Sequence, residues 1–351
     1  MAAFKDNLDR AACERLARAY SFDQDFVTAC VDALPALELK GRVAHIADTL
    51  RAHLDPSWPV ALEQLLAGLP PGMQTTEYLD HGFDWWPVVD VVGRHGLEHP
   101  EASVAALAEL TQRFSGEMAI RPFLREHPEV TWAYVRQWVT DTNPHVRRLA
   151  SEGTRPRLPW GGFLRHEPAW DVLDALVQDD TLYVRRSVAN HLGDIAKDHP
   201  EQAVERAAGW RDTEHGGWVV RHGLRHLVKK GHHGALALQG YVEPRLSNVR
   251  FSVTPQTVKF PGHVTFAVDA HSDVAQELVV DAVVHFQTAR GPSPKTWKWS
   301  TRGHPAGPLS LSRKYTLKPI STRRFVAGRH RVELQINGRV LAESFFDLVI
   351  P

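Results

Sequence analysis

Residues 141–160 join a conventional helix start to an exit that is rich in charge. The stretch reads DTNPHVRRLASEGTRPRLPW, with Glu152 in its middle. Arg148 precedes this carboxylate by about one helical turn, and Arg155, Arg157 and Trp160 follow it. Cations, a carboxylate and a flat aromatic ring around one cleft suit a particular ligand. That ligand would be anionic on its outside and cationic at its reactive centre.

The elements that must position these residues are helices that repeat. Four turns share a motif around Pro, namely LEHPEA, REHPEV, RHEPAW and KDHPEQ, and in each we expect Pro to begin a new helix. Three helices align as DTNPHVRRLA, DDTLYVRRSV and EHGGWVVRHGL, which places Val146, Val184 and Val220 at spacings of 38 and 36 residues. A helical hairpin recurring at this period predicts a HEAT-like solenoid.

A helical wheel separates two faces on the aligned helices. Valine and leucine positions share the apolar side, and the wheel places Arg148, Glu152 and Arg155 on the exposed side. One repeat on, Arg186 and Asn190 occupy the positions of Arg148 and Glu152. An exposed and mostly cationic stripe suits a nucleic-acid backbone. The alternative is that these arginines only form ion pairs between repeats.

The residue pattern changes near residue 242 from helical periodicity to strand-like alternation. From there about seven short segments are β-branched or aromatic and largely alternating, with Gly, Pro, Asn and Ser turns between them. The INGRV stretch is a hairpin signal of the Asn-Gly type. We therefore predict a mainly α protein with two domains. Residues 1–240 would form a HEAT-like domain for DNA binding and catalysis, and residues 241–351 an immunoglobulin-like β-sandwich.

Composition restricts the function classes. The first 139 residues hold 12 Lys and Arg against 20 Asp and Glu, whereas residues 243–351 hold 15 against 8. A basic end is compatible with a polyanionic partner. Cys13 and Cys30 suggest buried thiols in a reducing compartment and no disulfide framework. Without a signal peptide or an apolar run of about 18–20 residues, we expect a cytoplasmic monomer that does not enter membranes.

The central motif resembles one family. ASEGTRPRLPW, together with SGEMAIRPF and VRRSVANHLGDIAKDHP, is similar to the signature of AlkC-type DNA glycosylases, members of the HEAT-like repeat alkylpurine DNA glycosylase superfamily. The resemblance covers essentially the whole chain. It implies base excision repair at the nucleoid, acting on alkylated bases in double-stranded DNA without a metal or cofactor. The implied substrates are N3-methyladenine and N3-methylcytosine.

The chemistry that the resemblance implies suits the residues. A base alkylated at N3 carries a positive charge and leaves easily, so the enzyme must mainly stabilise an oxocarbenium-like sugar and orient a water molecule. We predict this role first for Glu152, second for Glu117 and more weakly for Asp194. Trp160 would contact the lesion and Arg148 a phosphate or Glu152. The set of predicted DNA- or lesion-binding residues is completed by Arg155, Arg157, Arg186 and Asn190.

Less specific interpretations stand beside these. The less favoured alternatives are that Glu117 is a surface carboxylate at a helix end and that Trp160 only packs between repeats. The histidines show no convincing metal-ligand spacing. A second function class is a HEAT-repeat scaffold that binds DNA structures without catalysis. Such a scaffold needs cations but neither Glu152 nor Glu117.

Overall fold

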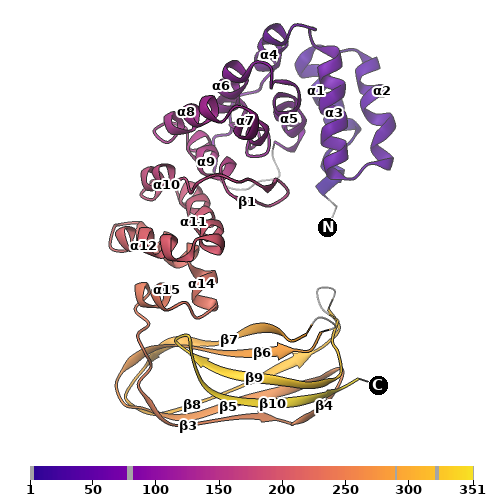
Figure 1. Ribbon diagram of the computed structural model, residues 1–351. Helices are drawn as coiled ribbons and strands as arrows, with labels where there is room; N and C mark the ends of the chain where they lie inside the picture. The colour runs from indigo at the N-terminus through magenta and orange to yellow at the C-terminus, as the bar shows by residue number, and fades with distance from the viewer. Residues whose placement is uncertain (1–3, 77–81, 289–290, 321–323, 351) are drawn as a thin grey trace. The chain divides into compact units, whose positions relative to one another are not determined.

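The computed structural model describes residues 4–76, 82–288, 291–320 and 324–350 (Figure 1). Contacts within the chain define two compact units. One comprises Met1–Asp198 with Asp212–Gly223, and the other His199–Arg211 with Leu224–Pro351. The predicted division into domains at residue 240 stays a prediction.

The predicted fold class, a HEAT-like helical array followed by a β-sandwich, is confirmed. The helices are α1 (Arg10–Tyr20), α2 (Gln24–Ala33), α3 (Leu39–His53), α4 (Trp58–Ala67), α5 (Trp86–His95), α6 (Pro100–Leu110), α7 (Ile120–Glu126), α8 (Pro128–Trp138), α9 (Pro144–Gly153), α10 (Trp170–Leu176), α11 (Leu182–Asp198), α12 (Pro200–Trp210), α13 (Gly216–Gly223), α14 (Arg225–Lys229) and α15 (His233–Leu238). Short 3₁₀ turns, η1 (Phe4–Asn7), η2 (Leu34–Ala36) and η3 (Phe83–Trp85), accompany them.

Alternate helices of the first unit pack on one another in two rows. One row contains α3, α5 and α7 and continues with α9, α11 and α13, and the other contains α4, α6, α8 and α10. The aligned valines Val146, Val184 and Val220 are all buried. This is how repeats that cannot bury an apolar face alone share one continuous core.

Most of the predicted proline starts are observed. Pro100, Pro128 and Pro200 each begin a helix directly after a His. The RHEPAW motif is an exception, because α10 begins at Trp170 and not at Pro168. The reason lies in His166, whose ring nitrogens contact the carbonyl oxygens of Thr154 at 2.7 Å and Glu167 at 2.6 Å. These contacts hold residues 166–168 as a bend below the end of α9.

The second unit contains the β-sandwich. Its strands are β3 (Leu246–Thr254), β4 (Thr257–Lys259), β5 (Gly262–Ser272), β6 (Gln276–Phe286), β7 (Ser293–His304), β8 (Gly307–Leu317), β9 (Gly328–Ile336) and β10 (Arg339–Val349). One sheet has the order β4-β10-β9-β6-β7 and the other β3-β5-β8. The two sheets enclose an apolar core that includes Phe266, Phe286 and Phe346. Each segment predicted from alternation overlaps a strand, and the three-residue β4 was missed.

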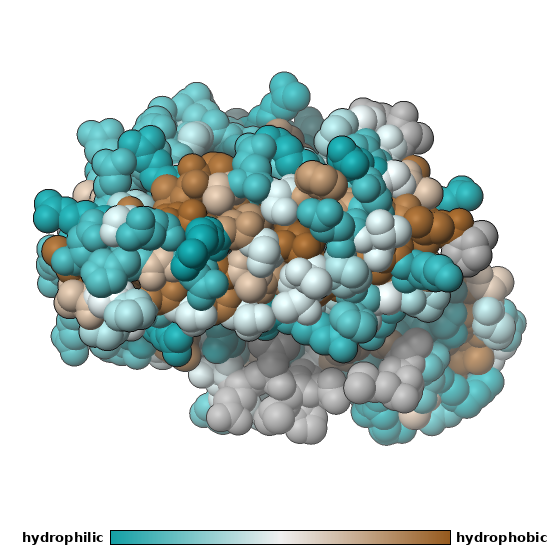
Figure 2. Space-filling model, turned by 90° about the horizontal axis from the view of Figure 1, so that it is seen from below, coloured by the Kyte–Doolittle hydropathy of each residue, from teal (hydrophilic) through white to brown (hydrophobic). Residues whose placement is uncertain are grey.

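The Asn-Gly hairpin signal is also confirmed. Asn337 and Gly338 connect β9 to β10 with positive φ angles of 46° and 80°, as a tight hairpin turn requires. Cys13 and Cys30 are buried free thiols, in agreement with their interpretation from the sequence. Across the described ranges, no helix has both the length and the apolar character needed to cross a bilayer. Figure 2 shows one face of the molecule, on which hydrophilic side chains predominate and hydrophobic patches lie between them.

Candidate active site

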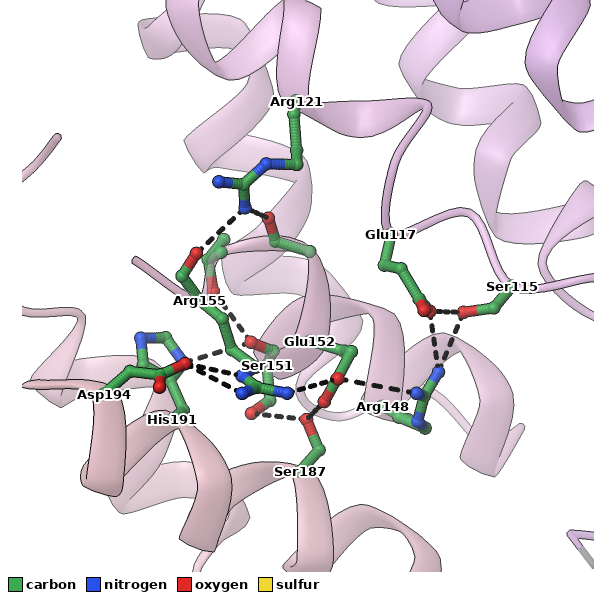
Figure 3. Close-up of polar contacts among 12 residues, drawn as sticks. Ser115, Glu117, Arg121, Arg148, Ser151, Glu152, Arg155, Ser187, His191 and Asp194 are labelled. Carbon is green, nitrogen blue, oxygen red and sulfur yellow. Dashed lines mark hydrogen bonds and ion pairs between the residues drawn. The ribbon is translucent and has the colours of Figure 1, made fainter. Parts of the chain in front are cut away.

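Helix α9 carries its polar residues into the interior. Arg148, Glu152 and Arg155, which the helical wheel placed on the exposed face, are each at most 7% exposed. That expectation was wrong because two segments cover this face of the helix. One is the 115–121 segment, and the other is the chain that leaves α9 after Gly153 (Figure 3).

Gly153 ends α9 where the helix approaches α7 most closely. A Cβ atom at this position would lie 2.7 Å from Cγ2 of Ile120. Glycine is therefore required here by close packing against α7, and not only as a weak helix residue. The close approach brings the carboxylate of Glu152 near the 115–121 segment.

Glu152 sits in a fully bonded, buried position. Its Oε1 accepts a hydrogen bond from Nη1 of Arg155 at 2.7 Å and lies 3.7 Å from Nη2 of Arg148. Its Oε2 accepts from the hydroxyl of Ser187 on α11 at 2.6 Å (Figure 3). Buried carboxylates are tolerated when cations and hydroxyl groups satisfy them in this way.

Glu117 lies on the other side of Arg148. Nη1 of Arg148 donates to Glu117 Oε2 at 3.0 Å and to Oγ of Ser115 at 2.8 Å. The Ser115 hydroxyl also donates to the Glu117 carboxylate. Glu117 is thus part of the same polar cluster as Glu152, as Figure 3 shows, and it is not a free surface carboxylate.

The two carboxylates differ in their proton affinity. Burial raises the pKa of Glu117, and the nearby charge of Glu152 raises it further, although Arg148 opposes both effects. Burial also acts to raise the pKa of Glu152, but Arg148 and Arg155 outweigh it, so this pKa lies below its ordinary value. Two neighbouring carboxylates with pKa values pushed apart can perform different tasks at one pH.

A short hairpin follows α9 and presents Trp160. Its strands β1 (Arg157–Leu158) and β2 (Gly162–Phe163) pair antiparallel, and Trp160 between them has a positive φ of 63°. Its side chain is 57% exposed and stacks on Trp86, with ring centroids 6.3 Å apart and planes 8° from parallel. Lys40 donates to its carbonyl oxygen. A bulky residue other than glycine is uncommon in this backbone region and costs conformational energy. We call residues 157–163 the Trp160 hairpin.

A cavity of about 380 Å³ opens beside these groups. Its polar side includes Glu117, Arg148 and Glu152, and aromatic rings, among them Trp86 and Trp160, form another part of its lining. A volume of this size fits a small planar ligand. The π-faces attract a cation, and a fixed carboxylate stabilises positive charge that develops next to it.

The other predicted site residues lie around this cavity without reaching it. Asp194 accepts hydrogen bonds from Arg155 at 2.9 Å and from Lys197, so it helps to hold the Arg155 guanidinium in place. Arg157 turns outward to Asp198, with its Nη2 2.6 Å from a carboxylate oxygen. On α11, Arg186 is exposed and Asn190 is partly buried. Neither these four predicted residues nor Arg155 belong to the described lining of the cavity.

Sequence reasoning missed several polar residues of the site, among them Ser187, His145 and Tyr183. Ser187 occupies an inward position where the aligned helices have Leu149 and Gly223, so a hydroxyl in an apolar stripe was the available signal. His145 and Tyr183 line the cavity and occupy equivalent positions in successive repeats. Nδ1 of His145 lies 3.2 Å from the Tyr183 hydroxyl. The sequence signal for His145 and Tyr183 was that ring-bearing side chains recur at the same position of adjacent repeats.

Comparisons with known proteins agree in fold along the whole chain. Residues 247–350 match the family model described as "Uncharacterised protein YhaZ, C-terminal Ig-like domain". The protein YhaZ of Bacillus subtilis (strain 168) is 35% identical over 315 residues, which cover 87% of this chain and 86% of YhaZ. A solved structure is also similar, that of the Pseudomonas fluorescens alkylpurine DNA glycosylase AlkC bound to DNA containing an abasic site analogue. It is 32% identical, with a TM-score of 0.86 over 99% of this chain and 100% of that one.

Proposed function

Because the chain belongs to the AlkC family of alkylpurine DNA glycosylases, we propose that it excises alkylated bases from double-stranded DNA by hydrolysing their N-glycosidic bonds. The proposal extends to a monofunctional enzyme that acts as a monomer at the nucleoid. The cationic bases N3-methyladenine and N3-methylcytosine are its proposed substrates.

One observation carries this proposal. Two carboxylates, the buried Glu152 and the largely buried Glu117, flank Arg148 at the wall of an aromatic cavity. Keeping charged carboxylates buried costs stability, so a scaffold that only binds phosphates gains nothing from them. An enzyme that must face a sugar with growing positive charge does gain from them.

The environments of the two carboxylates suggest separate roles. Glu152 has the lowered pKa and stays ionised, so we assign it to stabilising the oxocarbenium-like sugar. Glu117 has the raised pKa, which makes it the better base, so we assign it to orienting the water and accepting its proton. The leaving base needs no acid, because its own positive charge already makes it a good leaving group.

The aromatic lining supports cationic substrates in particular. Trp160 lines the cavity and is largely exposed, and ring faces favour a charged heterocycle over a neutral one. The positive charge of the lesion and the ring of Trp160 therefore give selectivity for alkylated over normal bases.

The proposal is tested by identifying the base released from methylated duplex DNA. Wild-type protein is expected to release N3-methyladenine and N3-methylcytosine. E152Q should lower the single-turnover rate by on the order of 10²–10³-fold while binding the same duplex normally. E201Q is the matched control, because the Glu201 side chain is 84% exposed and contacts only His232 among the described residues.

The same assay distinguishes the scaffold alternative. If wild-type protein binds damaged duplex but releases no base, the glycosylase proposal is wrong and the scaffold function is favoured. If E152Q releases bases as fast as E201Q, the role assigned to Glu152 is wrong even though the protein is a glycosylase.

A further inference from the structure

Arg121 is a buried cation that the proposed chemistry does not use. Its side chain is only 1% exposed, and it is one of the largest fully buried side chains in the described chain. Nη1 donates to the carbonyl oxygens of Gly153 at 3.2 Å and Arg155 at 2.8 Å (Figure 3). Nη2 donates to the carbonyl oxygen of Gly162 at 3.1 Å. One guanidinium thus binds three main-chain carbonyls.

These three carbonyls belong to the segment that carries the site. Gly153 is the last residue of α9, directly after Glu152. Arg155 precedes the Trp160 hairpin, and Gly162 lies in its second strand. The final carbonyls of a helix lack partners within the helix and carry partial negative charge, so a cation is favourable there. Arg121 therefore joins the end of α9, the segment that leads into the hairpin and the second strand of the hairpin.

Burying the Arg121 guanidinium costs free energy that apolar packing alone would not require. Burial, together with the nearby charges of Arg125 and Arg155, lowers the pKa of Arg121 to about 10, which still leaves it protonated at neutral pH. Its Nε is buried without a hydrogen-bond partner among the described residues. An apolar side chain of similar volume would avoid both costs. An apolar side chain could not, however, bind the carbonyl oxygens of residues 153, 155 and 162.

Arg121 also connects this segment to Glu117. Arg121 lies only four residues after Glu117 in the sequence, in the first turn of α7. Its guanidinium consequently links the segment that carries Glu117 with the segment that carries Glu152 and Trp160. A shift of either segment changes the geometry of the cavity between them.

We propose that Arg121 is a positioning residue, which sets Glu152 and Trp160 relative to Glu117 by binding the carbonyls of residues 153, 155 and 162. This inference rests on the proposed glycosylase function. Without Arg121 the hairpin keeps its sequence and its stacking partner, but its second strand and the residue that leads into it are no longer tied to the end of α9. Displacing catalytic groups by about 1 Å can lower a rate on the order of 10²-fold.

The test compares R121K and R121M with R185M. Arg185 is a matched control because its Nη1 also donates to a main-chain carbonyl, that of Asp179 at 2.9 Å, and its Nε is likewise buried without a partner among the described residues. Lysine keeps the buried charge but has no planar fork to span three carbonyls. For each folded variant we would measure single-turnover base release, the Kd for the same duplex, and amide hydrogen exchange in residues 154–163.

Both Arg121 variants are expected to release bases on the order of 10²-fold more slowly, with an unchanged Kd and faster exchange in residues 154–163. R185M should show neither change. If R121M does not fold, R121K decides the question. The proposal is overturned if the folded Arg121 variants excise at the wild-type rate, or lose rate only to the extent that R185M does.

Hydrogen exchange separates this inference from the function on which it rests. If wild-type protein releases no base, the proposed function fails, while accelerated exchange in R121K still shows that Arg121 holds the segment. If wild-type protein is active and exchange in R121K is unchanged, the positioning role fails and the glycosylase function stands.

Discussion

Arg148 binds Glu117 and Glu152 with the two ends of one guanidinium group. Its Nη1 lies 3.0 Å from Glu117 Oε2, and its Nη2 lies 3.7 Å from Glu152 Oε1. Because all three side chains are largely buried, water screens these charges little. A single cation therefore stabilises two carboxylates that would otherwise repel each other.

Removing that cation should destabilise the fold strongly. R148M leaves two buried carboxylates with less compensation, and we expect it to lower the free energy of unfolding by about 3–5 kcal/mol. The double variant R148M/E117Q removes one of the carboxylates and should recover part of that loss. Urea unfolding of the single and double variants measures the coupling. Strictly additive effects would show that Arg148 does not mediate between the carboxylates.

Glu117 should give stability a specific pH dependence. Since its pKa is raised in the folded state, its contribution is fully present below the ordinary Glu pKa of about 4.3 and is lost as pH rises through the raised pKa. The melting temperature of E117Q minus that of wild type should therefore increase with pH over this window. Thermal melts at a series of pH values measure it, with the exposed-site variant E201Q as control. A difference that falls with rising pH would contradict the raised pKa.

Trp160 should matter for excision more than for folding. Its ring is largely exposed, so W160A should leave the melting temperature almost unchanged while slowing release of a cationic base. W160F, which keeps a weaker π-face, should retain an intermediate rate. The buried partner in the stack provides the contrast, because W86A should cost about 3–5 kcal/mol of stability. Equal destabilisation by W160A and W86A would favour the packing interpretation of Trp160.

Gly153 should not tolerate a side chain. In G153A the new Cβ would lie 2.7 Å from Cγ2 of the buried Ile120, and we expect a loss of about 1–3 kcal/mol. The loss should shrink in an I120A background, where that methyl group is absent. A Cβ atom on Gly209 of α12 would meet no described atom within 4 Å, so G209A should instead stabilise by about 0.5–1 kcal/mol. Chemical denaturation of the four variants tests this contrast.

The helical part of the fold was predictable because its information is local and repeated. Valine positions at a fixed period and prolines after His each require only a few neighbouring residues to interpret. The strands of the sandwich were predictable for a similar reason, since alternation and an Asn-Gly turn are local signals. The start of α10 was not, because the contact of His166 with Thr154 spans twelve residues and ends in a carbonyl that no sequence pattern marks.

The site was predictable only in part. Glu152 and Trp160 were predicted because their segment interrupts the repeat, and Arg148 because it belongs to a cationic stripe that recurs. The burial of Glu152 and Arg148 was not predicted, since a helical wheel describes one helix and cannot include the segments that cover it. Ser187 and Arg121 reach the site across 35 and 32 residues of chain, respectively. Such contacts depend on how the repeats stack.

The Trp160 hairpin lies in the connection between α9 and α10, and the aligned repeat helices do not contain it. Solenoid repeats tolerate insertions in their connections, because each repeat contacts mainly its neighbours. The curvature of the array and the contents of this connection can therefore change independently during evolution. A relative that kept the helices but lost residues 154–163 would inherit the architecture without Trp160, and one that varied only this connection could change its lesion preference without refolding the array.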